Sequence, residues 1–319
     1  MNDASLSASD SHRAERASLV AEAERIIREG SKSFRFSSNL FDQATRERAW
    51  LLYSWCRACD DLADGQTLGH GAAAPADPER RIALIRDTTA RALAGERVGI
   101  APFDALRVVA AECALPRRFV ADHVEGFALD AAGWRPRSEA DLMLYCYRVA
   151  GSVGCMMAVV MGIDPDDEET LDRACDLGLA FQLANIARDL VEDHRVGRLY
   201  LPRDWVGDDG LDPDDRPRLA RLARRLADLA AAYEASARVG AARLRFRSRW
   251  AVLTAANVYG GIARKVAARG ASAWDSRTVV GKPAKLWLVG RALAESLLPA
   301  PARDREVLWT RPRHGEADG

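Results

Sequence analysis

The stretch "YSWCRACDDLAD", Tyr53 to Asp64, decides the fold, because it places acids in an otherwise apolar helix. Its apolar residues recur at the three- and four-residue spacing of an α-helix. One stripe of that helix carries the polar side chains, Tyr53, Arg57, Asp60, Asp61 and Asp64. The remaining positions are apolar or small and leave no ordinary solvent face. The acids are therefore either buried at a cost or line a functional site.

The same periodicity extends over nearly all of the 319 residues, and period-2 runs rich in Val, Ile and Thr are absent. These features predict an all-α protein. We expect helices at residues 17–28, 43–64, 79–94, 103–111, 117–132, 140–161, 168–194, 216–247, 250–269 and 284–298. No stretch of linker composition divides the chain, so we predict one domain at residues 17–299, with a flexible N-terminus at residues 1–16 and a loose tail at residues 300–319.

Composition excludes several function classes. Lys plus Arg and Asp plus Glu both total 46, so the formal net charge is zero and no nucleic-acid partner is expected. The N-terminus has no apolar signal-peptide core, and the uncharged stretch at residues 149–163 is shorter than the roughly 20 residues that span a bilayer. We therefore expect a cytoplasmic protein without a transmembrane helix. Cys56 and Cys59 form a C-x-x-C, but no second pair completes a zinc site.

A second acidic motif repeats the spacing of the first. D-x-x-x-D occurs at Asp60 to Asp64 and again at Asp189 to Asp193, in "RDLVED". Residues four apart lie on one helix face. One such motif is usually a solvated face, whereas two on strongly apolar helices indicate carboxylates that cations keep ionised.

The ligand type follows from the chemistry of carboxylates. Oxygen ligands from two helices, with one or two carboxylates per ion, suit a Mg²⁺ site completed by phosphate oxygens. Arg57 and Arg188, each beside an acidic motif, suit the same anion. Mg²⁺ and diphosphate inside an apolar helical cavity indicate an isoprenoid substrate, whose leaving group is neutralised while its tail is kept from water.

Four stretches then carry a resemblance to a known family: "SKSF" (31–34), "CRACDDLAD" (56–64), "YCYRVAGSVG" (145–154) and "DLGLAFQLANIARDLVEDHRVGRLYLP" (176–202). In this order they resemble the squalene and phytoene synthase family, and its bacterial phytoene synthases in particular. The resemblance continues through "LFDQATRERAWLLYSWC", "EGFALD" and the terminal "LWTRP". It implies an isoprenoid-synthase helical fold with a central cavity. The implied reaction joins two geranylgeranyl diphosphates head to head into phytoene, in carotenoid biosynthesis, without the NADPH that squalene synthase uses.

The matched motifs also imply roles for single residues. Asp60 and Asp64, with Asp61 adjacent, are the implied first metal cluster, and Asp189 and Asp193, helped by Asn185, are the second. Mg²⁺ is the expected metal, and Mn²⁺ is the alternative. The implied substrate and diphosphate positions are Ser31, Ser33, Phe34, Tyr53, Arg57, Gln182, Asn185, Arg188, Tyr259 and Arg277. Tyr147 is the implied catalytic residue close to the reacting carbons.

Several alternatives stay open at this point. One is a synthase that joins two farnesyl diphosphates to dehydrosqualene or squalene, and another is a non-catalytic scaffold protein of the same fold. Gly151 and Gly154 inside a helix indicate a close approach by a neighbouring helix or by a prenyl chain. The arginine-rich residues 216–250 form either a solvated helix face or a contact with an anionic membrane surface. Other enzymes of carotenoid biosynthesis are further expected partners.

Overall fold

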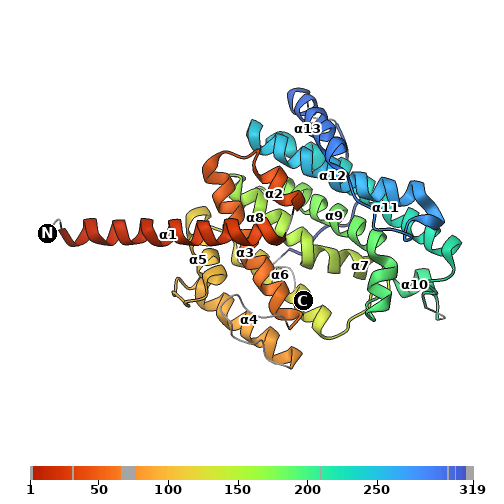
Figure 1. Ribbon diagram of the computed structural model, residues 1–319, viewed down its shortest axis with the longest axis horizontal. Helices are drawn as coiled ribbons and strands as arrows, with labels where there is room; N and C mark the ends of the chain where they lie inside the picture. The colour runs from red at the N-terminus through yellow and green to blue at the C-terminus, as the bar shows by residue number, and fades with distance from the viewer. Residues whose placement is uncertain are drawn as a thin grey trace. The chain divides into compact units, whose positions relative to one another are not determined.

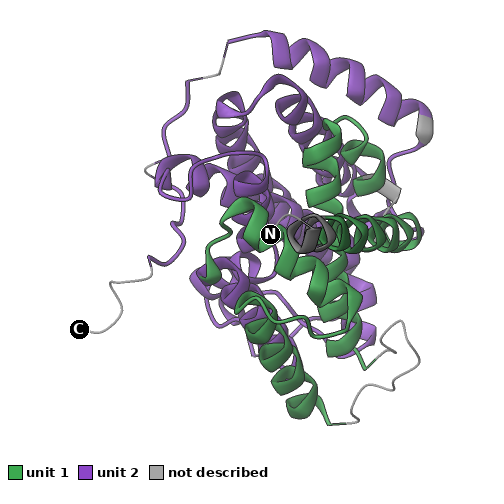
Figure 2. Ribbon diagram, turned by 90° about the vertical axis from the view of Figure 1, so that its left-hand side faces the viewer, with its two compact units in different colours: residues 1–117 green, residues 118–319 purple. Residues whose placement is uncertain are grey.

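The computed structural model describes residues 3–30, 32–65, 77–208, 210–299, 302–305 and 307–313. Every regular element in these residues is a helix, which confirms the predicted all-α class. The chain forms two compact units, residues 1–117 and residues 118–319, drawn in green and purple in Figure 2. The expected acidic motifs fall one in each unit.

The first unit is built around α3. Its helices are α1 (Asp3–Gly30), α2 (Lys32–Ser38), α3 (Gln43–Ala63), α4 (Pro78–Leu93) and α5 (Ala101–Cys113). α3 begins where the Asp42 side chain accepts from the Thr45 backbone N–H, and it packs against α1, α4 and α5 (Figure 1). Trp55 is fully buried, and its indole N–H donates to Thr89 of α4 over 3.3 Å. The apolar side of α3 thus forms the core of the unit.

The second unit is built around the long helix α9. Its elements are α6 (Arg117–Ala131), α7 (Glu139–Cys146), a π-helical turn η1 (Tyr147–Gly151), α8 (Ser152–Val160), α9 (Glu168–Arg195), α10 (Arg203–Val206), α11 (Arg216–Gly240), η2 (Ala241–Arg243), α12 (Phe246–Arg269), η3 (Gly270–Ser272) and α13 (Lys282–Leu297). α9 packs against η1, α8, α11 and α12. Leu179, Leu183 and Ile186 of α9 are buried. This packing fixes the helix that carries the second acidic motif.

The helix expected at residues 140–161 is interrupted by η1. The widened turn leaves the Arg148 carbonyl to other partners: the Ser152 hydroxyl donates to it over 2.8 Å, and Nδ1 of His123 on α6 lies 3.2 Å away. Hydrophobic periodicity could not predict this turn, because residues 149–163 are uncharged throughout, so the change of register at a π-turn leaves no mark in the pattern. α2 and the short α10 are likewise absent from the predicted helices.

A close approach between α9 and the η1–α8 segment explains the helical glycines. A Cβ at Gly154 would lie 2.4 Å from the Ala174 carbonyl oxygen, and a Cβ at Gly178 would lie 2.3 Å from the Ala150 carbonyl oxygen. Such distances admit only glycine. Of the two alternatives left open by the sequence, the neighbouring helix is therefore the one that approaches Gly154.

The chain ends carry more structure than the sequence indicates. α1 begins at Asp3, before the helix expected from residue 17. In the described part of residues 300–319, Arg305 and Arg311 form ion pairs with acids of α9. The division of the chain into residues 1–16, 17–299 and 300–319 therefore stays a prediction.

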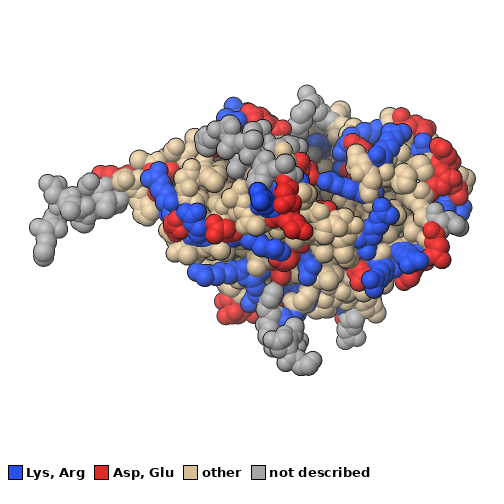
Figure 3. Space-filling view, turned by 90° about the horizontal axis from the view of Figure 1, so that it is seen from below, with Lys and Arg blue, Asp and Glu red and all other residues tan. Residues whose placement is uncertain are grey.

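One helical stretch in the described residues is long and apolar enough to span a membrane. It runs from Glu139 to Val160, through α7, η1 and α8, and 61% of its apolar window is buried inside the protein. This burial is typical of a core helix, in line with its packing against α9. On the face shown in Figure 3, basic and acidic side chains lie interspersed, as the zero net charge leads one to expect.

Candidate active site

The first acidic motif occupies the last turn of α3. The Arg57 guanidinium contacts both adjacent carboxylates, at 2.6 Å from Asp61 and 3.3 Å from Asp60. Asp64 is the C-cap residue of the helix and is exposed. The C-terminus of a helix is the negative end of its dipole, so acids gathered there call for nearby cations. Arg57 supplies one cation to the three acids.

Two aromatic positions implied as substrate contacts lie together in the same unit. The Phe34 and Tyr53 rings stack with centroids 5.3 Å apart. The Tyr53 hydroxyl reaches the end of α1, where a Cβ added to Gly30 would lie 2.6 Å from it. Ser31 lies outside the described residues, and for Ser33 only the helical backbone of α2 is described.

The second acidic motif occupies the last turns of α9. The Arg188 guanidinium pairs with both oxygens of Asp189, at 2.7 Å between Nε and Oδ1. Arg277 reaches the same region from the segment before α13: it lies 3.6 Å from Asp189 and 2.8 Å from Glu192. The structure therefore brings Arg277, which the sequence placed only by weak similarity, next to Asp189.

Asp193 is the least compensated carboxylate of this motif. Burial, together with the nearby Asp189 carboxylate, raises the pKa of Asp193 to about 7, and Arg198 and Arg188 oppose the shift only in part. A divalent cation between two such carboxylates would keep both ionised. This charge imbalance fits the expected metal.

The remaining implied positions of α9 lie on the same stripe as Asp189. Gln182 and Asn185 are half-buried, seven and four residues before it. Tyr259 of α12 stacks on Phe181, with ring centroids 4.2 Å apart. Gln182 and Asn185 thus share a stripe of α9 with Asp189, and Tyr259 of α12 contacts that helix through Phe181.

Tyr147 has a different environment from these residues. It is buried, its hydroxyl donates to Asp122 of α6 over 2.5 Å, and its ring lies 6.0 Å from that of Trp309 in the C-terminal segment. Burial and the Asp122 carboxylate both raise the pKa of Tyr147 above its usual range, so the phenol stays protonated. Its catalytic role stays a prediction, whereas its contacts with Asp122 and Trp309 were not predicted.

Sequence reasoning missed Asp122 and Trp309 because neither has a spacing that marks a site. Asp122 lies on a different helix from Tyr147, and Trp309 comes 162 positions after it in the chain. The only available signal was the "LWTRP" similarity near the C-terminus, which gave no contact partner.

Two other residues near the motifs have structural partners. Tyr200 stacks on Tyr145 at 4.8 Å, and both hydroxyls donate to Asp130. His194 lies in the last turn of α9, as expected for a C-terminal helix residue. The Tyr200 contacts tie the segment after α9 to α6 and α7.

The described side chains do not form a complete metal site by themselves. In the described residues, no group of three or more His, Cys, Asp and Glu side chains is arranged to hold a metal ion. Burial raises the pKa of the Cys56 thiol to about 12, and that of Cys59 also rises, so the C-x-x-C does not offer thiolates. Two carboxylates per motif suit Mg²⁺, which commonly keeps water and phosphate as its other ligands.

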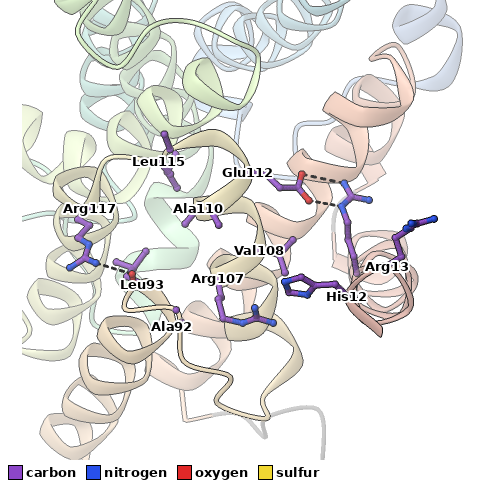
Figure 4. A pocket seen from close by; sticks show the side chains of 14 residues that line it. His12, Arg13, Ala92, Leu93, Arg107, Val108, Ala110, Glu112, Leu115 and Arg117 are labelled. Atoms are coloured by element: carbon purple, nitrogen blue, oxygen red, sulfur yellow. Dashed lines mark hydrogen bonds and ion pairs between the residues drawn. The ribbon is translucent and has the colours of Figure 1, made fainter. Parts of the chain in front are cut away.

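A pocket of about 780 Å³ in the first unit is separate from these residues (Figure 4). It is lined by α1, α5 and the end of α4, and it contains none of the predicted site residues. Its basic side chains are held by protein partners: Arg16 pairs with Glu112, and Arg117 donates to the Leu93 carbonyl oxygen. The pocket is therefore not part of the candidate active site.

Comparisons with known proteins agree with this geometry. The family model "Squalene/phytoene synthase" matches residues 27–284. The chain is 44% identical to the 15-cis-phytoene synthase of Pantoea ananas, over 92% of this chain and 98% of that protein, and 42% identical to that of a Paracoccus strain, over 93% and 99%. Both acidic motifs lie inside the matched residues.

Solved structures agree in fold. A dehydrosqualene synthase crystallised with a ligand has a TM-score of 0.78 and 26% identity, over 88% of this chain and 97% of that chain. A squalene synthase from Alicyclobacillus acidocaldarius has a TM-score of 0.70 at 23% identity, over 81% and 96%. The match of sequence over both motifs, together with the shared fold, establishes that the chain belongs to the squalene/phytoene synthase family.

Proposed function

We propose that this chain is a prenyltransferase that condenses two geranylgeranyl diphosphates head to head into phytoene, without NADPH. The observation that carries the proposal is the 42–44% identity to 15-cis-phytoene synthases over more than nine-tenths of the chain. The five motif aspartates and the arginines beside them are all in place. A non-catalytic scaffold would have no need of this charge arrangement.

Each acidic motif would hold Mg²⁺, the first through Asp60, Asp61 and Asp64 and the second through Asp189 and Asp193, assisted by Asn185. Bound Mg²⁺ would neutralise the diphosphate as it leaves. The elevated pKa of Asp193 supports this assignment, because burial and the Asp189 carboxylate both disfavour its ionised form, which a bound cation would restore. Mn²⁺ is the alternative metal.

The protein's own cations would orient the diphosphates. Arg57 lies at the first motif, and Arg188 and Arg277 lie at the second. A guanidinium binds phosphate oxygens through two parallel hydrogen bonds and stays charged at every working pH. These three side chains would therefore switch from carboxylate to diphosphate oxygens when the substrate binds.

The reaction needs two ionisations and two proton losses. Breaking the first C–O bond releases diphosphate, and the allylic cation is attacked by the double bond of the second substrate. Loss of one proton gives the cyclopropylcarbinyl diphosphate. Breaking the second C–O bond, rearrangement and loss of another proton then give phytoene, so no hydride is required. The departing diphosphate is the proposed proton acceptor. His123 is an unsuitable base, because its Nδ1 faces the Arg148 carbonyl and burial lowers its pKa to about 4.

A synthase that uses farnesyl diphosphate is the second candidate. Its support is the similarity of fold to a dehydrosqualene synthase at 26% identity, which is weaker than the identity to phytoene synthases. The length of the prenyl chain that an enzyme accepts depends on how deep its apolar cavity is. Geranylgeranyl and farnesyl diphosphate differ by five carbons, so analysis of the product distinguishes them directly.

The test is to incubate the purified full chain with geranylgeranyl diphosphate and Mg²⁺, without NADPH, and to identify the extracted hydrocarbon by chromatography and mass spectrometry. Phytoene is the expected product. No product from geranylgeranyl diphosphate but dehydrosqualene or, with NADPH, squalene from farnesyl diphosphate would overturn the choice of substrate. No turnover of either substrate would favour the scaffold.

Two further expectations remain proposals. The cytoplasmic location is tested by cell fractionation. An association with other enzymes of carotenoid biosynthesis is tested by co-purification with the enzyme that consumes phytoene.

A further inference from the structure

An exposed apolar surface lies along α13 and next to it. Eight large apolar side chains in the described residues are exposed, and six of them gather here. We call these six residues the α13 face: Phe246, Val279, Leu286, Trp287, Leu297 and Leu298. The side chains of Leu286, Trp287 and Leu297 are 64–72% exposed. Exposed apolar residues scattered singly are ordinary, whereas a concentration of them marks an interaction surface.

α13 is amphipathic, and only one side of it is covered. Leu288, Ala292 and Ser296 are buried, on the side that packs against α12 (Figure 1). The opposite side carries Trp287 and Leu297, ten residues apart, with only Gly290 and Ala294 between them on the same stripe. The uncovered stripe therefore runs along most of a 16-residue helix, which is roughly 24 Å long.

The start of α12 extends this surface at the C-terminal end of α13. The Arg249 side chain donates to the Leu298 carbonyl oxygen over 2.8 Å, and the Trp250 indole donates to the Val289 carbonyl oxygen over 3.0 Å. Phe246 lies on the same turn of α12, with its ring 6.4 Å from that of Trp250. Phe246 and Leu298 are thus brought to one end of the α13 face.

The charges around the α13 face are basic. Arg245 and Arg247 flank Phe246 and are exposed, and the Arg291 guanidinium lies 5.8 Å from the centre of the Trp287 ring. The one acid of α13, Glu295, is neutralised by Arg238 at 2.6 Å and by Arg291 at 2.7 Å. The surface therefore combines an apolar stripe with cationic edges and no uncompensated acid on the helix.

We propose that the α13 face docks on the surface of a membrane that contains anionic lipids, with α13 lying in the plane of the interface. An amphipathic helix with Trp and Leu on one side and basic residues at the edges binds such a surface by burying the apolar side chains between the lipid headgroups. Lys and Arg near the surface add attraction to anionic lipids. The charge pattern favours lipid over a second protein, because the basic edges complement a uniformly anionic partner.

This assignment differs from the membrane contact considered for residues 216–250. Two of the arginines of α11 are engaged within the protein: Arg224 donates to the Ala267 carbonyl, and Arg225 pairs with Glu139. Only Arg245, Phe246 and Arg247, at the end of that range, belong to the surface proposed here. The docking does not depend on which prenyl diphosphate the enzyme uses.

Flotation of the full chain with liposomes tests the proposal. The vesicles contain phosphatidylcholine alone or with about 30 mol% phosphatidylglycerol, since anionic lipid supplies the electrostatic part of the binding. The variant is the double substitution Leu286→Gln/Trp287→Gln. The matched control is Val196→Gln, because Val196 is equally exposed, at 68%, but lies at the end of α9 outside the α13 face.

The expected result is that wild type and Val196→Gln float with the anionic vesicles, and that the double variant binds at least about tenfold more weakly. Circular dichroism should show the same helix content in all three proteins. Phytoene formation in detergent should be unchanged in the variants, so the result of this test does not depend on that of the proposed function. Equal flotation of wild type and double variant would overturn the proposal. A wild type that does not float with the anionic vesicles would also overturn it. If the wild type were then a dimer in solution and the double variant a monomer, the α13 face would bind a second copy of the chain instead.

Discussion

α9 carries two pairs of aspartates with the same spacing, and the two pairs have different surroundings. Asp172 and Asp176 lie in its first half, and Asp189 and Asp193 lie near its end. Both are D-x-x-x-D, so both put two carboxylates on one helix face. The difference between them is how the protein's own arginines are shared between the two carboxylates.

The first pair is saturated by the C-terminal segment. Arg305 donates two hydrogen bonds to Asp176, both of 2.8 Å, and the Ser236 hydroxyl adds a third of 2.6 Å. Arg313 binds Asp172 in the same two-pronged way, at 2.6 and 2.7 Å, and the buried Arg311 lies 3.0 Å from it. All four carboxylate oxygens thus accept from protein donors, and the raised pKa of Asp176 comes first from its burial.

In the second pair the arginines are concentrated on one carboxylate. Arg188 and Arg277 both contact Asp189, while burial and the Asp189 carboxylate raise the pKa of Asp193 to about 7. The comparison teaches that the spacing of acids does not identify a metal site by itself. A site is indicated where the arginines leave one carboxylate of the pair, here Asp193, less compensated than the other.

A third pair of aspartates with this spacing, Asp60 and Asp64, lies at the end of α3, and its removal should have the largest effect. The double variant Asp60→Asn/Asp64→Asn should lose phytoene formation by at least about a thousandfold, because the leaving diphosphate would lose its metal. Product formation is measured with geranylgeranyl diphosphate, and circular dichroism checks the fold. Activity within tenfold of wild type would mean that this motif is only a solvated helix end.

The next effect concerns the saturated pair. Asp176→Asn should lower the free energy of unfolding by about 3 kcal/mol, because it leaves Arg305 without its buried counter-charge. Urea denaturation measures the change. A companion variant, Arg305→Met, should also destabilise the protein, because it leaves the buried Asp176 carboxylate without its arginine. Unchanged midpoints for both would show that the C-terminal segment does not hold α9.

Burial and neighbouring charge both shift the pKa values of the carboxylates. A pH titration of stability measures the effect of burial separately, at His123. Burial alone lowers the pKa of His123 to about 4, from 6.5 in the unfolded chain. The unfolded state therefore binds the proton first as pH falls, so stability is fully present above pH 6.5 and is lost between 6.5 and 4, by up to roughly 3 kcal/mol.

The control for this titration is His123→Gln, which keeps a side-chain donor but cannot be protonated. The part of the pH dependence that His123 causes should be absent from this variant, as measured by urea unfolding at several pH values. If the two curves stay parallel between pH 6.5 and 4, His123 is not the group responsible.

The smallest effect has the opposite sign to that of Asp176. Without Mg²⁺ at pH 8, Asp193→Asn should stabilise the protein by roughly 0.5–1 kcal/mol, because it removes repulsion from Asp189 at the cost of function. Differential scanning calorimetry measures the shift. A lower melting temperature would place Asp193 with the structurally saturated acids.

Much of this arrangement could be predicted from the sequence. The apolar periodicity was sufficient for the all-α class and for most helices, including α3 and α9, because burial of one face dominates helix packing. The two motifs and their adjacent arginines were also accessible, since helix geometry relates residues three and four positions apart.

The rest depended on contacts between distant residues. Asp176 pairs with Arg305, 129 residues away, and no local pattern connects them. The π-turn at Tyr147 is equally hidden, because it is held by His123 from another helix and by Ser152. The Asp172–Asp176 spacing would by itself have indicated a further metal motif, and only the tertiary partners distinguish the two pairs.

The most direct test of the central claim compares matched variants on the one helix. Phytoene formation from geranylgeranyl diphosphate and Mg²⁺ is measured for Asp189→Asn and for Asp172→Asn, at a temperature where both remain folded, and is expressed per folded molecule. We predict that Asp189→Asn loses at least about a hundredfold in turnover, whereas Asp172→Asn stays within a few-fold of wild type. Equal losses in the two variants, or full activity in Asp189→Asn, would contradict the distinction between a saturated pair and a metal-binding pair.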